Sequence, residues 1–551
     1  MKEEKIVKKF FALALVLMLA LGATSAFAEE VNIKVMDESL YPVAEGKELD
    51  IWCGQDGNVV DYEVNPENAY LEQLTGVKIN WTTAPGTQAD MNVVFNLNIA
   101  SGNYPDMYLN SYSTGDVMTY ANDVFIPLNE YIENTRWIKE YLEAAPEIKE
   151  AITAPDGNIY CLWRSVPTSP VENGWGTPFK LWIYKPWLEA SGMEMPDTVE
   201  EFKELLIYYR DHDMNGNGDT TDELPMFGSH AFDFDGSDPT WAVMNAFQLM
   251  TPNFLWADDD HNVTCVAVTD EFREGLKFLR GMYDEGLISE DIYALTLNEY
   301  RDVVNVTNAD DMVVAVAAAP AWMRFVTVSI YGERAYDDFT YMPVLKKDED
   351  SEAVTFQSKS APSLFGSVTV ACEDPQLAID WLDACIDPEL YLYSNYGVED
   401  EYWERKTEYG EFPVVLQQLK DLKDSGSQNT HTFGGWVFPA IPASYVESYY
   451  EPGTANYKMH EIQVEANQTY LASSKTNAFP SIAWCDDDDL VTEQAELKTV
   501  IEAAIRTGYA EFVLGRKDIN DDAAWQAYLD NLETLGLSRY LEVVKTINFG
   551  D

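Results

Sequence analysis

The sequence predicts an α/β fold, on three observations. The chain has 551 residues, of which 46% are hydrophobic and 24% charged, as is typical of globular proteins, and this length predicts more than one domain. After an acidic lead-in that ends near Asp50, two strand-like segments flank a helical one, which is the βαβ beginning of an α/β lobe. Near the end, two amphipathic segments predict that the C-terminal portion is rich in helices.

The first elements follow from short apolar patterns. Residues 50–53 and 77–81 have the composition and alternation of strands, and residues 65–74 between them have a helical pattern. A turn at 154–157 precedes a further strand predicted over 158–163.

The best-specified helix begins after Thr198. Thr198 and Glu201 have the spacing of a capping box, which satisfies the free N–H groups of a helix start. Its apolar face consists of Val199, Phe202, Leu205, Leu206 and Tyr209. The last two predicted helices span 497–509 and the region of Trp525 to Leu532, where the helical spacing places Trp525 inside.

The charge excludes some classes of function. The chain has 36 Lys and Arg against 94 Asp and Glu, a net charge of −58 that repels phosphate backbones and anionic membranes. Aromatic residues are abundant, with 15 Trp and 32 Tyr, so their rings either pack inside or face a flat ligand. Nucleic acid is therefore excluded as a partner, and a polyanionic ligand is disfavoured.

Residues 1–28 are predicted to be a secretory signal. Lysines precede an apolar run from Phe10 to Leu21, and small residues lead to a cleavage site after Ala28. The run is shorter than the ~20 residues that span a bilayer, so the alternatives are a cleaved signal or, less favoured, a buried helix. Cleavage predicts an exported protein, extracellular, associated with the cell surface or periplasmic, with a net charge of −60.

The six cysteines contain no C-x-x-C pair, so neither a zinc ribbon nor a thioredoxin-type site is predicted. Disulfide pairing cannot be inferred from their spacing, and structural thiols are favoured.

A loop rich in Asp, Asn and Gly after the Thr198 helix is the strongest chemical motif. Calcium takes six to eight oxygen ligands, and alternating carboxylates and amides around glycines supply them. The predicted ligands are Asp213, Asn215, Asn217, Asp219 through its carbonyl, Asp222 and Glu223. The loop resembles the first half of an EF-hand, but position 12 is Leu224 and no second helix follows. We expect a structural Ca²⁺; the alternative is a surface turn that binds nothing.

Several segments occur in an order that resembles one family. They are 100–106, 155–160, 187–198, the loop at 213–223, and 395–399. The chain resembles the LplA-like extracellular solute-binding proteins, the carbohydrate-capturing components of ABC importers, to which alginate-binding proteins also belong. It departs from them in two ways: the acidic pair at 222–223 comes one residue late, which leaves open which of the two closes the calcium site, and the lipobox Cys is missing.

The resemblance implies a two-lobed, periplasmic-binding-protein-like fold with a hinge and an interlobe ligand cleft. The predicted division is a first lobe from 29–160 and 308–375, and a second lobe from 161–307 and 376–551 that includes the C-terminal helices. The calcium-type residues of the family map onto the Asp213–Glu223 loop named above.

Sugar rings stack on aromatic side chains while their hydroxyls bind charged and amide groups, so loops that combine both are candidate sites. The candidates are Trp163, Arg164, Trp175, Trp241, Trp322, Arg324 and Trp436. Trp175 and Trp436 are favoured because glycine neighbours would expose their rings. For each candidate the alternative is packing in a core.

The sequence thus predicts a non-catalytic, monomeric solute-binding protein. It would close around a neutral oligosaccharide and deliver it to an ABC transporter permease. The alternatives are a secreted glycoside hydrolase or polysaccharide lyase, a peptide-binding protein, or a surface adhesin. The last would have repeats, which we do not find. No G-x-S-x-G or H-E-x-x-H motif is present, and the five His are scattered, which disfavours an enzyme.

Overall fold

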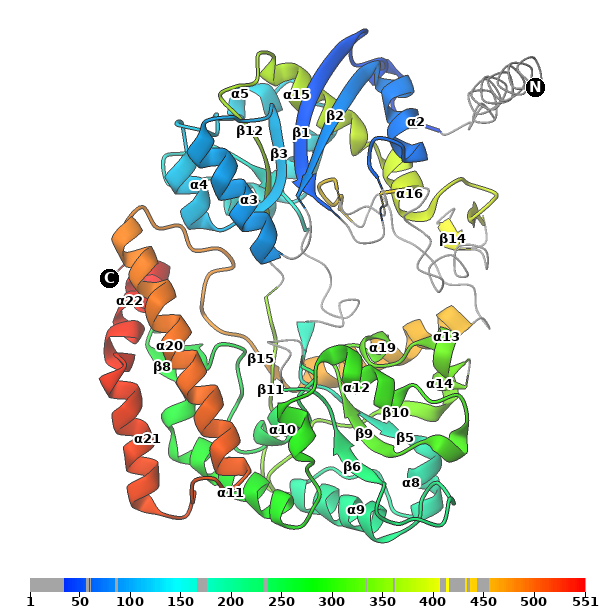
Figure 1. Cartoon of the computed structure of the whole chain (residues 1–551), viewed down its shortest axis with the longest axis vertical. Coiled ribbons are helices and arrows are strands. Elements are labelled where there is room, and N and C mark those ends of the chain that lie inside the picture. The colour runs from blue at the N-terminus through cyan, green and yellow to red at the C-terminus, as the bar shows by residue number, and fades with distance from the viewer. Residues whose placement is uncertain are drawn as a thin grey trace, which may run out of the picture.

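The chain forms two lobes, each with its own sheet and hydrophobic core (Figure 1). This computed structural model describes residues 34–55, 59, 61–84, 88–165, 176–230, 236–332, 334–359, 362–406, 413–415, 432–433, 437–442 and 455–550. The predicted signal at 1–28, Trp175 and Trp436 lie outside these residues. Within them, no helix has the length and apolarity needed to cross a membrane. All six cysteines are free thiols.

The first lobe is built on a five-stranded sheet of order β2-β1-β3-β12-β4. Its strands are β1 (Lys47–Gly54), β2 (Val77–Ala84), β3 (Met107–Tyr112), β4 (Leu162–Trp163) and β12 (Leu364–Val368), with a separate hairpin of β13 (Trp403–Arg405) and β14 (Pro413–Val415). Its helices are η1 (Glu38–Leu40), α2 (Pro66–Thr75), α3 (Gln88–Ser101), α4 (Thr114–Tyr120), α5 (Asn129–Ile132), α6 (Trp137–Ala144), α7 (Pro146–Ile152), α15 (Pro375–Cys385) and α16 (Pro388–Tyr396).

The predicted βαβ unit is confirmed as β1-α2-β2. The Asn65 side chain caps α2 by accepting the Glu67 N–H at 2.9 Å, and Gly76 ends the helix in the left-handed conformation at φ 71°. β2 then pairs with β1 in parallel along its whole length. The strand predicted over 158–163 is shorter, because only the two residues of β4 pair with β12.

The second lobe is built on a four-stranded sheet of order β10-β5-β9-β6. Its strands are β5 (Leu181–Tyr184), β6 (Leu224–Phe227), β9 (Val314–Ala318) and β10 (Phe339–Tyr341), with a hairpin of β7 (Leu255–Ala257) and β8 (Val263–Cys265). Its helices are α8 (Lys185–Ser191), α9 (Val199–Asp211), α10 (Pro239–Met244), η3 (Val266–Val268), α11 (Asp270–Asp284), η4 (Glu290–Tyr293), α12 (Leu297–Val304), η5 (Ala309–Asp311), η6 (Trp322–Arg324), α13 (Val328–Tyr331), α14 (Ala335–Asp338), α19 (Ala455–Ala472), α20 (Asp488–Val513), α21 (Asp522–Thr534) and α22 (Leu537–Phe549).

Helix α9 follows its prediction closely. The Thr198 hydroxyl accepts the Glu201 N–H at 3.3 Å, and the Glu201 carboxylate accepts the Thr198 N–H at 3.1 Å, so the capping box is complete. All five residues of the predicted apolar face are buried. Helix α9 is therefore held firmly in the second lobe, and the calcium-type loop begins directly after it.

The C-terminal helices α20, α21 and α22 cover one side of the second lobe (Figure 1). Both predicted helices are present, and Trp525 is buried as predicted. Helix α20 begins nine residues before the predicted Leu497, at Asp488, and α22 was not predicted.

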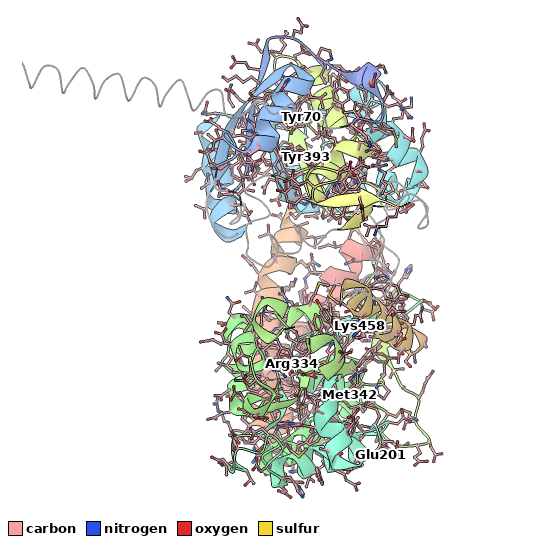
Figure 2. The ribbon with its side chains drawn as sticks, turned by 90° about the vertical axis from the view of Figure 1, so that its right-hand side faces the viewer. Tyr70, Glu201, Arg334, Met342, Tyr393 and Lys458 are labelled. Carbon is pink, nitrogen blue, oxygen red and sulfur yellow. The ribbon has the colours of Figure 1, made fainter. Side chains whose placement is uncertain are left out.

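The predicted division between the lobes needs correction. Strands β9 and β10, within the 308–375 assigned to the first lobe, pair with β5 in the second. Helices α15 and α16, within the 376–551 assigned to the second lobe apart from the first residue of α15, pack in the first core. Figure 2 shows Arg334 and Met342 in the same lobe as Glu201, and Tyr393 in the lobe of Tyr70. Strand partners far apart in the sequence set these boundaries.

The segments that cross between the lobes lie at one end of each sheet. β4 runs in the direction of β3 because both pair antiparallel with β12, and β6, β9 and β10 share one direction in the second sheet. The chain leaves the first lobe after β4 and enters the second at the start of β5. It returns after β10, through β11 (Thr355–Phe356), which pairs with β15 (Ser474–Lys475), to the start of β12. In both lobes the carboxyl ends of the parallel strands therefore face the crossing segments.

Candidate ligand and calcium sites

The carboxyl ends of parallel strands are where open α/β sheets bind ligands, and the described aromatic candidates all follow or flank such ends. Trp163 ends β4, and Arg164 begins the crossing. Trp322 follows β9, and Trp241 lies on α10, which follows β6. The structure therefore brings candidates from both lobes to the crossing side, although they are far apart in the sequence.

Trp163 is packed inside the first lobe. Its side chain is fully buried, and its Nε1 donates to the Ala440 carbonyl oxygen at 2.6 Å. Arg164 is half-buried, with its guanidinium 4.6 Å from the centre of the Phe365 ring. Its backbone N–H donates to the Ser363 carbonyl at 2.8 Å, so it fixes the start of the crossing segment.

Trp322 and Arg324 lie on η6, directly after β9. Trp322 is buried and stacks on Tyr336, with ring centres 5.3 Å apart and planes at 18°. Its Nε1 has no hydrogen-bond partner among the described residues. Arg324 is half-buried beside it.

Trp241 is buried on α10, beneath the Arg506 guanidinium, which lies 5.4 Å from its ring centre. Asp238 caps this helix by accepting the Thr240 N–H at 2.8 Å. The Trp241 Nε1 is also without a partner among the residues that the structure describes.

The three described tryptophans are thus packed in the cores, which was the alternative to ligand stacking in the sequence prediction. They do not present a ring face on which a sugar could stack. A role toward a ligand stays a prediction for Trp163, Trp241 and Trp322, as it does for Trp175 and Trp436.

Lys180 is a residue at this edge that the sequence reasoning missed. It is fully buried at the start of β5, and its Nζ donates to the Pro320 carbonyl at 3.0 Å and to the carbonyl of Thr177. Burial lowers the pKa of this amine well below its usual value. The only signal in the sequence is a lysine directly before an apolar strand, which normally marks a strand end facing water.

The calcium-type loop folds around its own backbone. The Asp213 carboxylate accepts the N–H of Gly216 at 2.7 Å and of Gly218 at 2.8 Å, and both glycines have positive φ angles of 78° and 91°. The Asn215 and Asn217 side-chain oxygens accept backbone N–H groups two residues onward. Carboxylate and amide oxygens of this kind are the ligands that calcium loops use.

The closing residues fit a cation. Asp222 accepts the Asn217 side-chain amide at 2.7 Å, and the Glu223 carboxylate accepts the Met214 N–H at 2.8 Å. The second oxygen of each carboxylate, Asp222 Oδ1 and Glu223 Oε2, is buried without a partner among the described residues. Burial, together with the neighbouring Asp222 charge, raises the pKa of Glu223. Two orphaned anionic oxygens in one loop are what a Ca²⁺ ion would satisfy.

The described residues contain no group of three or more His, Cys, Asp or Glu side chains placed to hold a metal by themselves. The Asp219 carboxylate accepts the Thr221 N–H at 2.9 Å, and a ligand role for its carbonyl stays a prediction. The candidate site depends on amide and carbonyl oxygens as much as on carboxylates.

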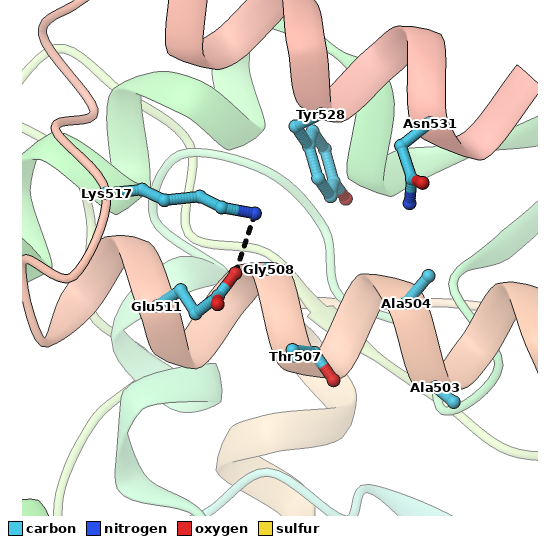
Figure 3. Close-up of a pocket in the computed structure, with 8 residues that line it drawn as sticks. All are labelled: Ala503, Ala504, Thr507, Gly508, Glu511, Lys517, Tyr528 and Asn531. Carbon is cyan, nitrogen blue, oxygen red and sulfur yellow. Dashed lines mark ion pairs between the residues drawn. The ribbon is translucent and has the colours of Figure 1, made fainter.

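A pocket of about 240 Å³ lies elsewhere, between α20 and α21 (Figure 3). It is lined by small side chains, by Tyr528 and by an ion pair in which the Lys517 Nζ lies 2.7 Å from the Glu511 carboxylate. It touches neither sheet edge, so we do not assign the ligand to it.

Comparison with known proteins agrees with this arrangement. The fructooligosaccharide ABC transporter substrate-binding protein FusA of Streptococcus pneumoniae is 26% identical over 493 residues, which cover 86% of this chain and 84% of FusA. The chain is similar to the extracellular solute-binding proteins of carbohydrate ABC transporters. Lipoprotein LipO of Bacillus subtilis is 24% identical to this solute-binding protein over 304 residues, 54% of each chain. No family model matches the sequence.

Solved structures confirm the fold of this solute-binding protein. An EF-hand mutant of FusA in complex with fructo-nystose has a TM-score of 0.72 at 24% identity, covering 91% of this chain and 98% of that one. The alginate-binding protein AlgQ2 without calcium has a TM-score of 0.64 at 18% identity, covering 93% and 100%. FusA is an ABC transporter substrate-binding protein, which confirms the prediction of a non-catalytic binding protein over a hydrolase and agrees with export.

Proposed function

We propose that this protein captures a neutral oligosaccharide, of the fructo-oligosaccharide class, for an ABC importer. The FusA relative carries that ligand class in its name, and its solved complexes contain kestose and fructo-nystose. Both are uncharged sugars. The net charge of −58 supports the same choice, because it would repel alginate or another polyanion.

The observation that carries the proposal is the placement of both carboxyl edges toward the crossing segments. A ligand held there touches both lobes, and a ligand that binds one arrangement of the lobes more tightly shifts the population toward it. Sugar capture is therefore proposed to proceed by closure of the lobes about the crossing segments.

A structural Ca²⁺ in the Asp213–Glu223 loop is the second part of the proposal. The orphaned oxygens of Asp222 and Glu223 support it, and so does the EF-hand of FusA. Ca²⁺ would supply charge compensation and a fixed loop, because it would coordinate the side-chain oxygens that the loop now turns inward.

The remaining parts concern partners and location. We propose a monomer that is exported by the signal at 1–28 and that meets the membrane permease outside the cytoplasm.

Thermal-shift measurements on the chain without residues 1–28 test these proposals. Kestose, nystose, an alginate trisaccharide and a tripeptide are compared, each with and without EGTA. At 100 times its Kd a true ligand adds about 2.7 kcal/mol of stability, and we expect this from the neutral sugars, with no release of reducing ends. Stabilisation by the tripeptide or alginate alone would contradict the neutral-sugar assignment, and sugar hydrolysis would contradict a binding role.

The calcium part has its own control. EGTA is expected to lower the melting temperature of the wild type, and excess Ca²⁺ to restore it. The Asp213→Ala variant should melt lower and no longer respond to either. A wild type that is indifferent to EGTA and Ca²⁺ would refute the metal and leave the sugar assignment standing.

A further inference from the structure

A largely buried histidine–aspartate pair lies at the carboxyl end of β6, with side-chain exposures of 12% for His230 and 9% for Asp238. His230 follows this strand after only two residues, and its Nδ1 lies 2.5 Å from Asp238 Oδ2. The other oxygen of Asp238 accepts the Thr240 N–H at 2.8 Å and the Thr240 hydroxyl at 2.6 Å. The carboxylate is therefore fixed by the start of α10, and it fixes the orientation of the imidazole in turn.

The ring of His230 is held on its other sides by aromatic residues. Tyr509 lies parallel to it at 7° with ring centres 5.9 Å apart, and Tyr293 and Trp241 lie 5.1 Å and 6.2 Å away. The backbone N–H of His230 donates to the Ile292 carbonyl at 2.7 Å. Neither the ring nor its backbone is free to turn.

This rigid pair leaves two neighbouring polar atoms unused. The Nε2 of His230 and the Nε1 of Trp241 are buried, and neither has a hydrogen-bond partner among the described residues. An orphaned buried polar atom costs roughly 1 to 3 kcal/mol, and native structures keep few of them without a reason. The orphaned atoms of His230 and Trp241 belong to neighbouring rings and lie at the edge where α/β sheets bind ligands. Ligand binding is therefore a reason for keeping them unpaired.

The two atoms are complementary in chemistry. With Nδ1–H donating to the carboxylate, a neutral His230 presents Nε2 as an acceptor, whereas the Trp241 indole presents only a donor. A sugar hydroxyl both donates and accepts, so this chemical group can satisfy either atom. A fully deprotonated anion cannot satisfy the neutral form of His230, because it has no hydrogen to give to Nε2.

We propose that His230 and Trp241, with Asp238 as the positioning residue, form a hydroxyl-recognising subsite for the captured saccharide. This rests on the proposed function and deepens it, since it assigns specificity for an uncharged hydroxyl to named atoms of the second lobe. It also gives Trp241 a role through its N–H rather than through the ring face that the sequence predicted.

Calorimetric titration of the protein with kestose and nystose tests the subsite. The variants are His230→Phe and Trp241→Phe, each of which keeps an aromatic ring and removes the polar atom. The control is Trp137→Phe, because the Trp137 Nε1 is also buried without a partner but lies in the core of the other lobe. Melting temperatures are measured on all four proteins.

We expect both subsite variants to bind sugar about 10- to 100-fold more weakly than the wild type, the equivalent of one or two lost hydrogen bonds. His230→Phe should melt below the wild-type temperature, because it also leaves Asp238 Oδ2 without its partner. Trp241→Phe should melt at or above the wild-type temperature, because it removes only an orphaned N–H. The control should keep wild-type affinity whatever its stability.

Subsite variants that bind within twofold of the wild type would overturn this inference alone and would indicate a purely structural cluster. Affinity lost equally in Trp137→Phe would overturn it as well, since the loss would then reflect general destabilisation. A wild type that binds neither sugar would overturn the proposed function together with the subsite.

Discussion

The most deeply buried charged side chains in the described parts of the two lobes have opposite signs. In the first lobe they are Glu67, Asp383 and Asp387, each at most 2% exposed, and in the second lobe Lys180 is fully buried. The carboxylates accept hydrogen bonds from backbone N–H groups, whereas the amine donates to backbone carbonyls. Both lobes therefore use the peptide backbone to solvate a buried charge.

The difference lies in what each charge ties together. Glu67 on α2 accepts the Phe433 N–H and the Ser394 hydroxyl, which brings the late segment of the first lobe onto its first helix. Lys180 instead joins the entry of β5 to the exit of β9, next to the crossing segments. The first lobe is thus fastened by anions in its body, and the second by a cation at the edge near the proposed ligand. Three changes test this contrast.

The largest effect is expected from Asp383→Ala. Asp383 accepts the N–H groups of Arg136, Trp137 and Ile138 at 2.7 to 2.9 Å, and so caps α6 from another helix. Removing it leaves three backbone donors without an acceptor, with an expected loss of about 3 to 4 kcal/mol in urea unfolding. The control is Asp380→Ala, one turn away, which loses one bond to Gln376 and should cost less than about 1 kcal/mol. Equal losses would show that Asp383 is not a fastening point.

Glu67→Gln is expected to change the pH dependence of stability. Burial raises the pKa of Glu67 from 4.5 to about 7. The folded state therefore holds its proton more tightly than the unfolded state, so the contribution is fully present below pH 4.5 and is lost as pH rises to 7. The loss is about 3 kcal/mol.

Comparing the wild type with Glu67→Gln separates the pH-dependent contribution of Glu67 from the contributions of the many acidic residues on the surface. We expect Glu67→Gln to match the wild type at pH 4.5 and to be the more stable protein at pH 8, because its amide oxygen can still accept the Phe433 N–H. Unfolding free energies that keep a constant difference from pH 4.5 to 8 would contradict the raised pKa.

Lys180→Met should give a slope of the opposite sign. The folded pKa of Lys180 is lowered, so the wild type gains stability as pH rises toward the unfolded pKa of 10.5, whereas the variant lacks this gain. Near neutral pH the lost charge and the two abandoned carbonyls offset each other, and we expect a difference within about 2 kcal/mol. Unfolding free energies of both proteins at pH 7 and pH 9.5 measure the difference near neutral pH and its change with pH. A wild type whose stability falls relative to the variant at pH 9.5 would refute the lowered pKa of Lys180.

The contacts of these buried charged residues could not be predicted from the sequence. Local patterns predicted β1-α2-β2, the α9 capping box and the calcium-type loop, because each depends on residues within one short segment. The lobe boundaries were wrong because β9 and β10 are assigned by partners more than a hundred residues away. Nothing near Lys180 or Glu67 in the sequence indicates a carbonyl or an N–H from another segment.

The same reason applies to the candidate ligand residues. Composition predicted tryptophans beside polar groups, but burial of Trp163, Trp241 and Trp322 depends on which segments cover them. His230 was only one of five scattered histidines in the sequence, since neither its contact with Asp238 nor its orphaned Nε2 is visible in the spacing alone. Topology, and not composition, places these residues at one edge.

The smallest effect compares one capping box from each lobe. Ser113 begins α4 in the first lobe and Thr198 begins α9 in the second, each with a reciprocal carboxylate three residues later. Ser113 is exposed, whereas Thr198 is 7% exposed, so water can replace the lost hydroxyl more easily at Ser113. We expect Thr198→Ala to cost about 1 to 2 kcal/mol and Ser113→Ala about 0.5 to 1 kcal/mol in thermal or urea unfolding. Because α9 leads into the calcium-type loop, Thr198→Ala should also weaken the stabilisation by Ca²⁺, and Ser113→Ala should leave it unchanged. A larger loss for Ser113→Ala would show that burial does not set the strength of these caps.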